Sequence, residues 1–335
     1  MAATKVLVVD DSLTMRALIS GALERIPGVE VVGLADGAAE ARELVQTLRP
    51  HVMTLDVEMP GMSGIEYLAE IMETRPMPVI MFSTRTTDGA ADSIEALRLG
   101  AIDCLPKPLV AAPAEIDAII AKLGKRIKAA KTADLKAARS AAATGVAPPL
   151  DWNGRVLVVG GDASSTAMLF DLFATFPANG PPTVVVQHLG PGLVEGMVAK
   201  LREKVAPKVE VATDGMAIEQ GTIYFAPQGE AHLVLDAWPS GRLRLLARDP
   251  VAGERPSISL LFAAAAKAAG ANAVGLLLID GSEDGGAGVK AMLGAGGYAF
   301  SPAPGGGYVL ARGMASQPVA RDGLAAMVIK QCSKS

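Results

Sequence analysis

Short apolar runs alternate with amphipathic stretches along the first 110 residues. The run at residues 5–9 is β-branched and leads into Asp10-Asp11, after which a helical pattern begins behind Ser12. The same alternation predicts strands at residues 29–34, 52–55, 78–83 and 101–105, and helices at residues 39–48, 65–73 and 90–99. Five strand–helix units in this order favour a doubly wound parallel sheet, and therefore an α/β fold.

Polar side chains follow four of these strands, at the carboxyl edge of the predicted sheet, where ligands of open α/β folds bind. They are Asp10, Asp11, Asp56, Ser83 and Lys107. Three crowded carboxylates repel one another unless a hard divalent cation lies among them, and oxygen ligands suit Mg²⁺. A carboxylate neutralised in this way can attack a phosphoryl group, which Lys107 and Ser83 would then contact. Each acid alone is more simply an N-cap or a solvated loop residue, but the combination is specific.

Three motifs, taken in register, resemble the receiver domain of two-component response regulators. They are residues 8–12 (VVDDS), residues 55–64 (LDVEMPGMSG) and Lys107-Pro108. The resemblance indicates a receiver domain at residues 1–122. It implies that a histidine kinase phosphorylates Asp56, that Mg²⁺ binds there with the two preceding acids, and that a cis peptide precedes Pro108. Receivers usually carry Tyr or Phe where Cys104 stands, so we expect signal transmission to take another route near the fourth and fifth strands.

Residues 123–151 are interpreted as a linker. Residues 114–124 complete the receiver with a last helix, and residues 125–143 are rich in Ala, Lys and Arg before Gly145, Pro148 and Pro149. The basic residues form either a face for a partner or a solvated helix, and we assign them no chemistry.

The pattern of residues 152–335 predicts a second, mainly parallel α/β domain that contains a β-hairpin. Strands are expected at residues 155–159, 183–187, 222–227 and 273–279, a helix at residues 167–173, and a hairpin from residues 233–236 and 242–246. Polar residues follow these strands too, among them His188 and Asp284. A carboxylate that orients a histidine, which activates a hydroxyl, is the arrangement of hydrolases that form a covalent intermediate. A zinc site from His188, His232 and Asp284 is an alternative, although no HExxH spacing supports it and His232 is more simply structural.

A series of short motifs in this domain resembles the chemotaxis protein-glutamate methylesterase/protein-glutamine glutaminase family (CheB). The motifs are VVQHL at residues 185–189, YFAP at residues 224–227, RPS at residues 255–257 and DG at residues 284–285. The order of receiver, linker and methylesterase-like domain matches that family along the whole chain. The resemblance implies a serine esterase that removes methyl groups from glutamate esters on the cytoplasmic helices of chemoreceptors, and that is released by phosphorylation of its receiver.

The loop that should carry the nucleophile departs from the family pattern. The family has Gly-Ala-Ser-Thr-Gly-Gly, whereas residues 160–165 read Gly-Gly-Asp-Ala-Ser-Ser, so Asp162 occupies the nucleophile position. Residues 280–284, Asp-Gly-Ser-Glu-Asp, likewise replace Gly-Met-Gly-Asn-Asp. A carboxylate attacking an ester forms an anhydride and opposes the developing oxyanion.

Two hypotheses follow from this loop. In the first, the domain is weakly active or inactive and acts by binding, while Asp162, Ser164 and Ser165 cap the helix at residues 167–173. In the second, the domain is an ordinary active enzyme of the family, with His188 and Asp284 in place and Ser164 or Ser165 as a substitute nucleophile after a shift of the loop.

Composition narrows the class of partner. A chain of 335 residues with 50% hydrophobic residues is sufficient for about two well-packed domains. With 31 basic and 35 acidic residues it has no basic field for nucleic acid or for an anionic membrane, so proteins are the expected partners. The two cysteines lack a disulfide framework, and no signal peptide or membrane span is apparent, which favours the cytoplasm. Mg²⁺ is the one cofactor we expect, with no organic group.

Overall fold

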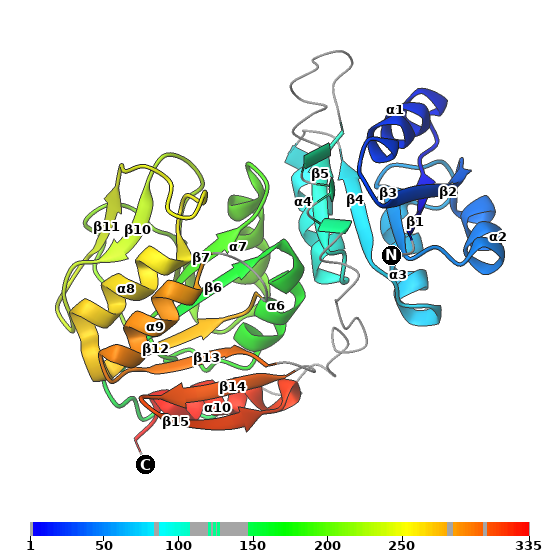
Figure 1. Cartoon of the computed structure of the whole chain (residues 1–335). Helices are drawn as coiled ribbons and strands as arrows, with labels where there is room; N and C mark the ends of the chain where they lie inside the picture. The colour runs from blue at the N-terminus through cyan, green and yellow to red at the C-terminus, as the bar shows by residue number, and fades with distance from the viewer. Residues whose placement is uncertain are drawn as a thin grey trace. The chain divides into compact units, whose positions relative to one another are not determined.

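The computed structural model describes residues 3–83, 87–107, 120–121, 123–124, 126–127, 147–279, 284–303 and 307–334. The chain divides into two compact units, residues 1–139 and 140–335. Each unit is built around a β-sheet with helices packed beside it (Figure 1). Within the described ranges, no helix combines the length and the apolar character needed to cross a bilayer.

The first unit has the five-stranded parallel sheet that the alternating pattern predicts. Its strand order is β2-β1-β3-β4-β5, and all four pairings are parallel. The strands are β1 (Thr4–Val9), β2 (Val29–Ala35), β3 (Val52–Asp56), β4 (Val79–Ser83) and β5 (Asp103–Pro106). The helices are α1 (Leu13–Glu24), α2 (Ala38–Leu48), α3 (Gly64–Thr74) and α4 (Thr87–Arg98). As expected, α1 begins behind Ser12, whose hydroxyl accepts a hydrogen bond from the amide of Met15.

One core cluster of the first unit joins β1, β3 and β4 to α1 and to residues beyond β5. Leu123 and Ile127 are fully buried in it. The packing of this unit therefore continues past residue 122, where we expected the linker to begin. In the same region, Arg126 Nε lies 2.7 Å from Oδ2 of Asp103 at the start of β5. Most of the proposed linker, residues 128–146, lies outside the described residues.

The second unit has an eight-stranded sheet of order β15-β14-β13-β12-β6-β7-β9-β8. The pairings are parallel except those of β14 with β13 and β15. Its strands are β6 (Val156–Asp162), β7 (Thr183–His188), β8 (Lys208–Val211), β9 (Thr222–Phe225), β12 (Ala273–Leu277), β13 (Tyr298–Pro302), β14 (Tyr308–Arg312) and β15 (Ala315–Val319). Its helices are α6 (Thr166–Ala174), α7 (Leu193–Lys204), α8 (Ile258–Ala269), α9 (Gly286–Gly294) and α10 (Leu324–Cys332), with 3₁₀ turns η2 (Ala163–Ser165), η3 (Gly270–Asn272) and η4 (Arg321–Gly323). The mainly parallel α/β architecture is confirmed.

The predicted hairpin of the second unit is formed by β10 (His232–Leu235) and β11 (Leu243–Leu246), which pair antiparallel. Leu233 and Leu243 are fully buried in the same core cluster as Phe262 of α8. The hairpin therefore lies against the helix that begins beside the candidate hydrolase site. Both cysteines of the chain are buried free thiols.

Candidate phosphoacceptor and hydrolase sites

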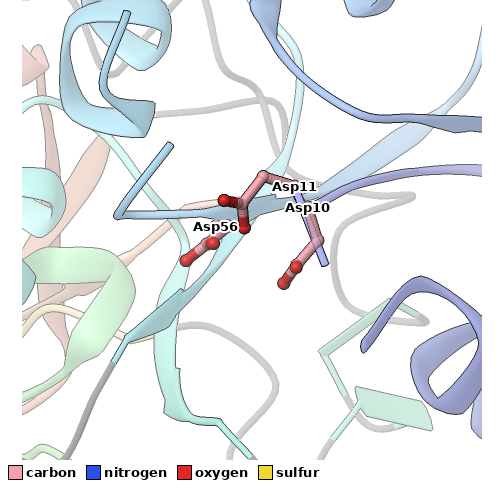
Figure 2. A group of neighbouring side chains, drawn as sticks. All are labelled: Asp10, Asp11 and Asp56. Carbon is pink, nitrogen blue, oxygen red and sulfur yellow. The ribbon is translucent and has the colours of Figure 1, made fainter. Parts of the chain in front are cut away.

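The three predicted acids of the first unit meet at one end of its sheet. Asp10 and Asp11 follow β1, Asp56 is the last residue of β3, and one carboxylate oxygen from each lies within 4.8 Å of the others (Figure 2). Asp10 and Asp56 are buried, whereas Asp11 is exposed. The fold thus brings together the acids that the strand-end pattern predicted on one edge.

The loop after β3 holds Asp56 in place through a glycine and a helix cap. The amide of Gly64 donates to the carbonyl oxygen of Val57 at 2.9 Å, and a Cβ on Gly64 would lie 1.7 Å from the carbonyl oxygen of Asp56. Only a residue without a side chain fits this approach. Next to it, the Ser63 hydroxyl accepts from the amide of Glu66, and the Glu66 carboxylate accepts from the amide of Ser63. This capping box starts α3 immediately beside the acidic cluster.

Lys107 partly balances the buried negative charge. Its Nζ lies 2.7 Å from Oδ2 of Asp56 and 3.9 Å from Oδ2 of Asp10. Burial, followed by the charge of Asp10, raises the pKa of Asp56 to about 6, although the hydrogen bond from Lys107 opposes that rise. Burial also raises the pKa of Asp10. Burial lowers the pKa of Lys107, but the hydrogen bond to Asp56 and the nearby carboxylates raise that pKa above its ordinary value on balance.

Ser83, the predicted phosphoryl-contacting hydroxyl, ends β4 beside this cluster and has a partner that the sequence did not suggest. Its Oγ lies 2.9 Å from Oγ of Ser93 in α4, and both residues are buried. The thiol of Cys104 in β5 donates to the carbonyl oxygen of Ser93 at 3.3 Å. The predicted cis peptide before Pro108 lies outside the described residues.

In the second unit, two polar residues end neighbouring strands. Asp162 is the last residue of β6, His188 is the last residue of β7, and the two are direct register partners. The start of α8 packs against the end of β6, where a Cβ on Gly160 would lie 2.2 Å from Cγ2 of Ile258. The glycine at this position lets the first turn of α8 approach the strand ends.

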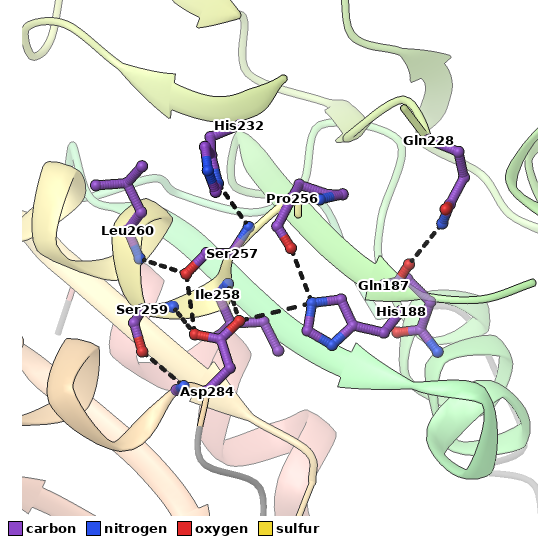
Figure 3. Close-up of polar contacts among 11 residues, drawn as sticks. Gln187, His188, Gln228, His232, Pro256, Ser257, Ile258, Ser259, Leu260 and Asp284 are labelled. Atoms are coloured by element: carbon purple, nitrogen blue, oxygen red, sulfur yellow. Dashed lines mark hydrogen bonds and ion pairs between the residues drawn. The ribbon is translucent and has the colours of Figure 1, made fainter. Parts of the chain in front are cut away.

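His188 is paired with Asp284, as the sequence predicts (Figure 3). Its Nε2 lies 3.6 Å from Oδ2 of Asp284 and 2.9 Å from the carbonyl oxygen of Pro256. A carbonyl oxygen only accepts hydrogen bonds, so we assign the ring proton to Nε2, which leaves Nδ1 as the basic nitrogen.

Asp284 is 1% exposed and accepts three hydrogen bonds from the beginning of α8. Its Oδ1 accepts from Oγ of Ser257 at 2.9 Å and from the amide of Ser259 at 2.8 Å, and its Oδ2 accepts from the amide of Ile258 at 2.6 Å. The first amides of a helix lack partners within it and favour a negative charge. Asp284 therefore fixes the start of α8 as well as facing the imidazole of His188.

The loop after β6, where the family resemblance places the nucleophile, is closed by its own hydrogen bonds. Oδ1 of Asp162 accepts from the amide of Ser164 at 3.1 Å and from its hydroxyl at 2.6 Å. Oγ of Ser165 donates to the carbonyl oxygen of Asp162 at 2.7 Å and accepts from the Asp162 amide at 3.0 Å. These contacts cap the 3₁₀ turn η2 and not the following helix directly, because Ser165, the N-cap of α6, makes no capping hydrogen bond with its side chain. The capping interpretation thus applies one turn earlier than predicted.

Gln187 supports this loop and was missed by the sequence analysis. It is 1% exposed, and its Nε2 donates to the carbonyl oxygen of Asp162 and to Oγ of Ser165. A glutamine directly after the apolar run of residues 183–186 was the available signal, since a polar side chain buried at a strand end needs partners.

His232 has the structural role that the sequence favoured. It is fully buried, its Nδ1 accepts from the amide of Ser257 at 3.0 Å, and its Nε2 lies 3.0 Å from the carbonyl oxygen of Asp249. Both ring nitrogens are therefore used within the fold. The alternative zinc site with His188 and Asp284 is wrong, because among the described residues only the acidic cluster of the first unit has metal-ligand spacing.

The two sites and their order along the chain define a class of protein. An acidic cluster with a lysine at the carboxyl edge of a five-stranded parallel sheet is the arrangement of a receiver domain, and the α/β unit that follows carries a hydrolase-type His–Asp pair, as in a response regulator with an enzymatic output domain. Sequence profiles agree, since the response regulator receiver domain matches residues 6–121 and the CheB methylesterase matches residues 157–329. The chain belongs to the protein-glutamate methylesterase/protein-glutamine glutaminase family.

Relatives cover most of the chain. The protein-glutamate methylesterase/protein-glutamine glutaminase of Agrobacterium fabrum is 44% identical over 302 residues, which are 88% of this chain and 85% of that protein. The protein-glutamate methylesterase/protein-glutamine glutaminase 1 of Caulobacter vibrioides is 42% identical over 300 residues, which are 88% of this chain and 86% of that protein. The solved catalytic domain of Thermotoga maritima CheB methylesterase is 26% identical, covers 46% of this chain and 82% of that domain, and has a TM-score of 0.43.

Proposed function

We propose that this chain is a phosphorylation-controlled chemotaxis response regulator whose methylesterase-like domain hydrolyses receptor esters weakly or not at all and acts mainly by binding chemoreceptor helices. Its cellular place is the cytoplasm, where a histidine kinase supplies the phosphoryl group to Asp56. The single observation that carries the proposal is Asp162, which stands at the nucleophile position and caps η2 with its side chain.

Magnesium is proposed as the ion of the first site, and the residues fit it. Oδ2 of Asp10 is buried without a hydrogen bond, as an oxygen reserved for a cation would be, and Asp11 supplies an exposed carboxylate beside it. Hard oxygen ligands with room for retained water suit Mg²⁺. When bound, the ion would offset the repulsion between the carboxylates and the charge of a transferred phosphoryl group.

Asp56 is proposed as the phosphoacceptor. One of its carboxylate oxygens would attack the phosphorus of a phosphohistidine, so that an O–P bond forms while the P–N bond breaks and the histidine nitrogen leaves. The amide of Glu58 donates to Oδ1 of Asp56 at 3.1 Å, and Lys107 Nζ contacts Oδ2. These contacts orient the carboxylate, and Lys107 is placed to pair with the phosphoryl group afterwards.

One electrostatic argument and two hydrogen bonds support weak or absent ester hydrolysis. A carboxylate at the proposed nucleophile position opposes the negative charge that develops on an ester oxygen, which raises the barrier. The Ser165 hydroxyl is buried and uses its proton on the carbonyl oxygen of Asp162. The exposed Ser164 hydroxyl donates to Asp162 and not to His188. The base and the hydroxyl of a serine hydrolase are therefore not paired in this loop.

The second candidate function is an active protein-glutamate methylesterase and glutaminase that works through Ser164. One observation favours it, namely the 2.6 Å hydrogen bond from Oγ of Ser164 to the carboxylate of Asp162, which could accept the serine proton. The names of the relatives also favour it.

Methanol release from methylated receptor membranes separates the two candidates. The full chain is phosphorylated with a small phosphodonor and Mg²⁺, and wild type is compared with Asp162→Ser, Ser164→Ala and Ser165→Ala, with His188→Ala as the background. We expect wild type to match the His188→Ala background and to co-sediment with the receptor membranes when phosphorylated. Turnover well above background that is lost in Ser164→Ala would refute the proposal and identify Ser164 as the nucleophile. A lack of phosphorylation-dependent binding would refute the binding output.

A further inference from the structure

The hydroxyl groups of Ser83 and Ser93 form a buried contact between the phosphoacceptor edge and α4. Their Oγ atoms are 2.9 Å apart, Ser83 is 6% exposed and Ser93 is 1% exposed. Ser83 ends β4, the strand next to β3 and Asp56, whereas Ser93 lies in the middle of α4. The contact therefore joins a residue of the predicted phosphoryl site to a helix that carries none of the predicted site residues.

The direction of this hydrogen bond follows from the second partner of Ser93. Oγ of Ser93 lies 2.6 Å from the carbonyl oxygen of Gly89, which only accepts hydrogen bonds. Ser93 therefore donates its single hydroxyl proton to the carbonyl oxygen of Gly89. Ser83 must be the donor in the contact with Ser93.

This direction matters because a phosphoryl oxygen is also only an acceptor. Ser83 has one hydroxyl proton, and in this structure it donates that proton in a hydrogen bond to Oγ of Ser93. To donate to a phosphoryl group on Asp56, Ser83 has to break its hydrogen bond to Ser93. The two hydrogen bonds of Ser83 are thus mutually exclusive.

Cys104 holds the other side of Ser93. Its thiol donates to the carbonyl oxygen of Ser93 at 3.3 Å, so β5 contacts the same residue of α4 that β4 contacts through Ser83. Burial raises the pKa of Cys104 well above its ordinary value, which keeps the sulfur protonated and able to donate. The thiol thus links α4 to β5 through this hydrogen bond.

We propose that Ser93 is a positioning residue that latches α4 to β4 in the unphosphorylated receiver and is released when Ser83 turns to the phosphoryl group. The latch rests on the proposed function, since it requires Asp56 to be the phosphoacceptor. After release, Ser93 keeps its bonds to Gly89 and Cys104, so α4 keeps its hydrogen bond to β5 and loses this hydrogen bond to β4. The change at the phosphoryl site is thereby carried to α4.

Removing the latch favours the phosphorylated conformation. In Ser93→Ala, the buried Ser83 hydroxyl loses its partner in the resting form only, while the loss of the Gly89 bond affects both forms equally. The net contribution of a hydrogen bond between uncharged groups corresponds to a factor of about 2 to 10 in an equilibrium constant. We therefore expect Ser93→Ala to bind a phosphoryl mimic about 2- to 10-fold more tightly than wild type.

Beryllofluoride with Mg²⁺ serves as the probe of the full chain, and its half-saturating concentration is followed by amide hydrogen exchange at the Asp56 loop and at α4. Ser93→Ala should bind more tightly, and Ser93→Thr, which restores the hydroxyl, should return the affinity to that of wild type. Thr74→Ala is the matched control, because Thr74 makes the same hydrogen bond to the carbonyl four residues earlier, in α3, away from Ser83. Equal or weaker binding by Ser93→Ala, or no return in Ser93→Thr, would overturn the latch.

A measurement on wild type alone keeps the proposal testable if the variants fold poorly. Saturating beryllofluoride should speed amide exchange in the α4 turns around Ser93 while leaving α3 unchanged. Unchanged exchange in α4 on saturation would overturn the latch and leave phosphorylation of Asp56 intact. Failure of wild type to bind the probe at all, with Asp56→Asn giving the same result, would instead overturn the proposed function of the receiver and the latch together.

Discussion

Neutralising Asp56 should stabilise the first unit when no metal is bound. The Asp56 side chain is buried, and its pKa rises from an ordinary 3.8 to about 6. Since one pKa unit corresponds to about 1.4 kcal/mol, the ionised carboxylate costs about 3 kcal/mol at neutral pH. Asn keeps an acceptor for Lys107 but carries no charge, so we expect Asp56→Asn to raise the free energy of unfolding of this unit by about 1–3 kcal/mol.

The sign of the pH dependence follows from the direction of this shift. Because the pKa of Asp56 in the folded chain is raised, its favourable contribution is fully present below pH 3.8 and is lost as the pH rises through about 6. The stability of wild type relative to Asp56→Asn should therefore fall between about pH 4 and pH 7. When Mg²⁺ is bound at neutral pH, wild type should be the more stable of the two proteins. The cation binds the ionised carboxylate of Asp56 in the folded state, and Asn offers it no such charge.

Amide hydrogen exchange in the full chain, with chelator present, measures this prediction. Protection of the buried strand amides Val8, Met53 and Ile80 reports on the first unit, whereas both tryptophans of the chain, Trp152 and Trp238, report on the second. Asp36→Asn is the control, an exposed acid directly after β2. Equal protection in wild type and Asp56→Asn without metal, or a loss of protection in the variant, would refute the electrostatic reasoning.

Three further predictions concern the effect of single substitutions on stability. Gly64→Ala should destabilise the first unit by roughly 3 kcal/mol or more, because its Cβ would lie 1.7 Å from the carbonyl oxygen of Asp56; unchanged exchange of the strand amides would contradict this. His232→Leu should lower the stability of the second unit by about 1–3 kcal/mol in urea unfolding followed by tryptophan fluorescence, since the buried amide of Ser257 loses its acceptor and the carbonyl oxygen of Asp249 loses its donor. Gly160→Ala, whose Cβ would lie 2.2 Å from Cγ2 of buried Ile258, should cost roughly 1–3 kcal/mol in the same assay, and a neutral result would show that α8 yields there.

The periodic parts of the fold were predictable from the sequence. The strands of the first unit alternate with helices whose apolar spacing is regular, and Ser12 marks the start of α1. The strand-end rule then places Asp10 and Asp56 together without further information. By contrast, β8, β13, β14 and β15 were not predicted. In β15 only Val319 is buried, so this strand has no apolar period, and its pairing depends on β14.

Side-chain partners within the sites were less predictable than their locations. The sequence places His188 and Asp284 at strand ends, but the contact of His188 with the carbonyl of Pro256 depends on how the loop before α8 packs. The bond between Ser83 and Ser93 likewise joins residues ten positions apart whose approach is set by the packing of α4 on β4. Short-range pattern carries no information on such contacts, which tertiary packing decides.

The hydrogen bonds of Asp284 give this proposed catalytic residue a second, structural role. Because this carboxylate satisfies three donors at the start of α8, replacing it would harm folding whether or not the domain turns over a substrate. The side chain of Asp162, in contrast, caps η2, so an aspartate at the proposed nucleophile position carries no penalty to the fold. Selection for stability alone would preserve the acid and leave the nucleophile free to drift. In diverged members of this family, a retained acid at the position of Asp284 is therefore weak grounds for inferring turnover.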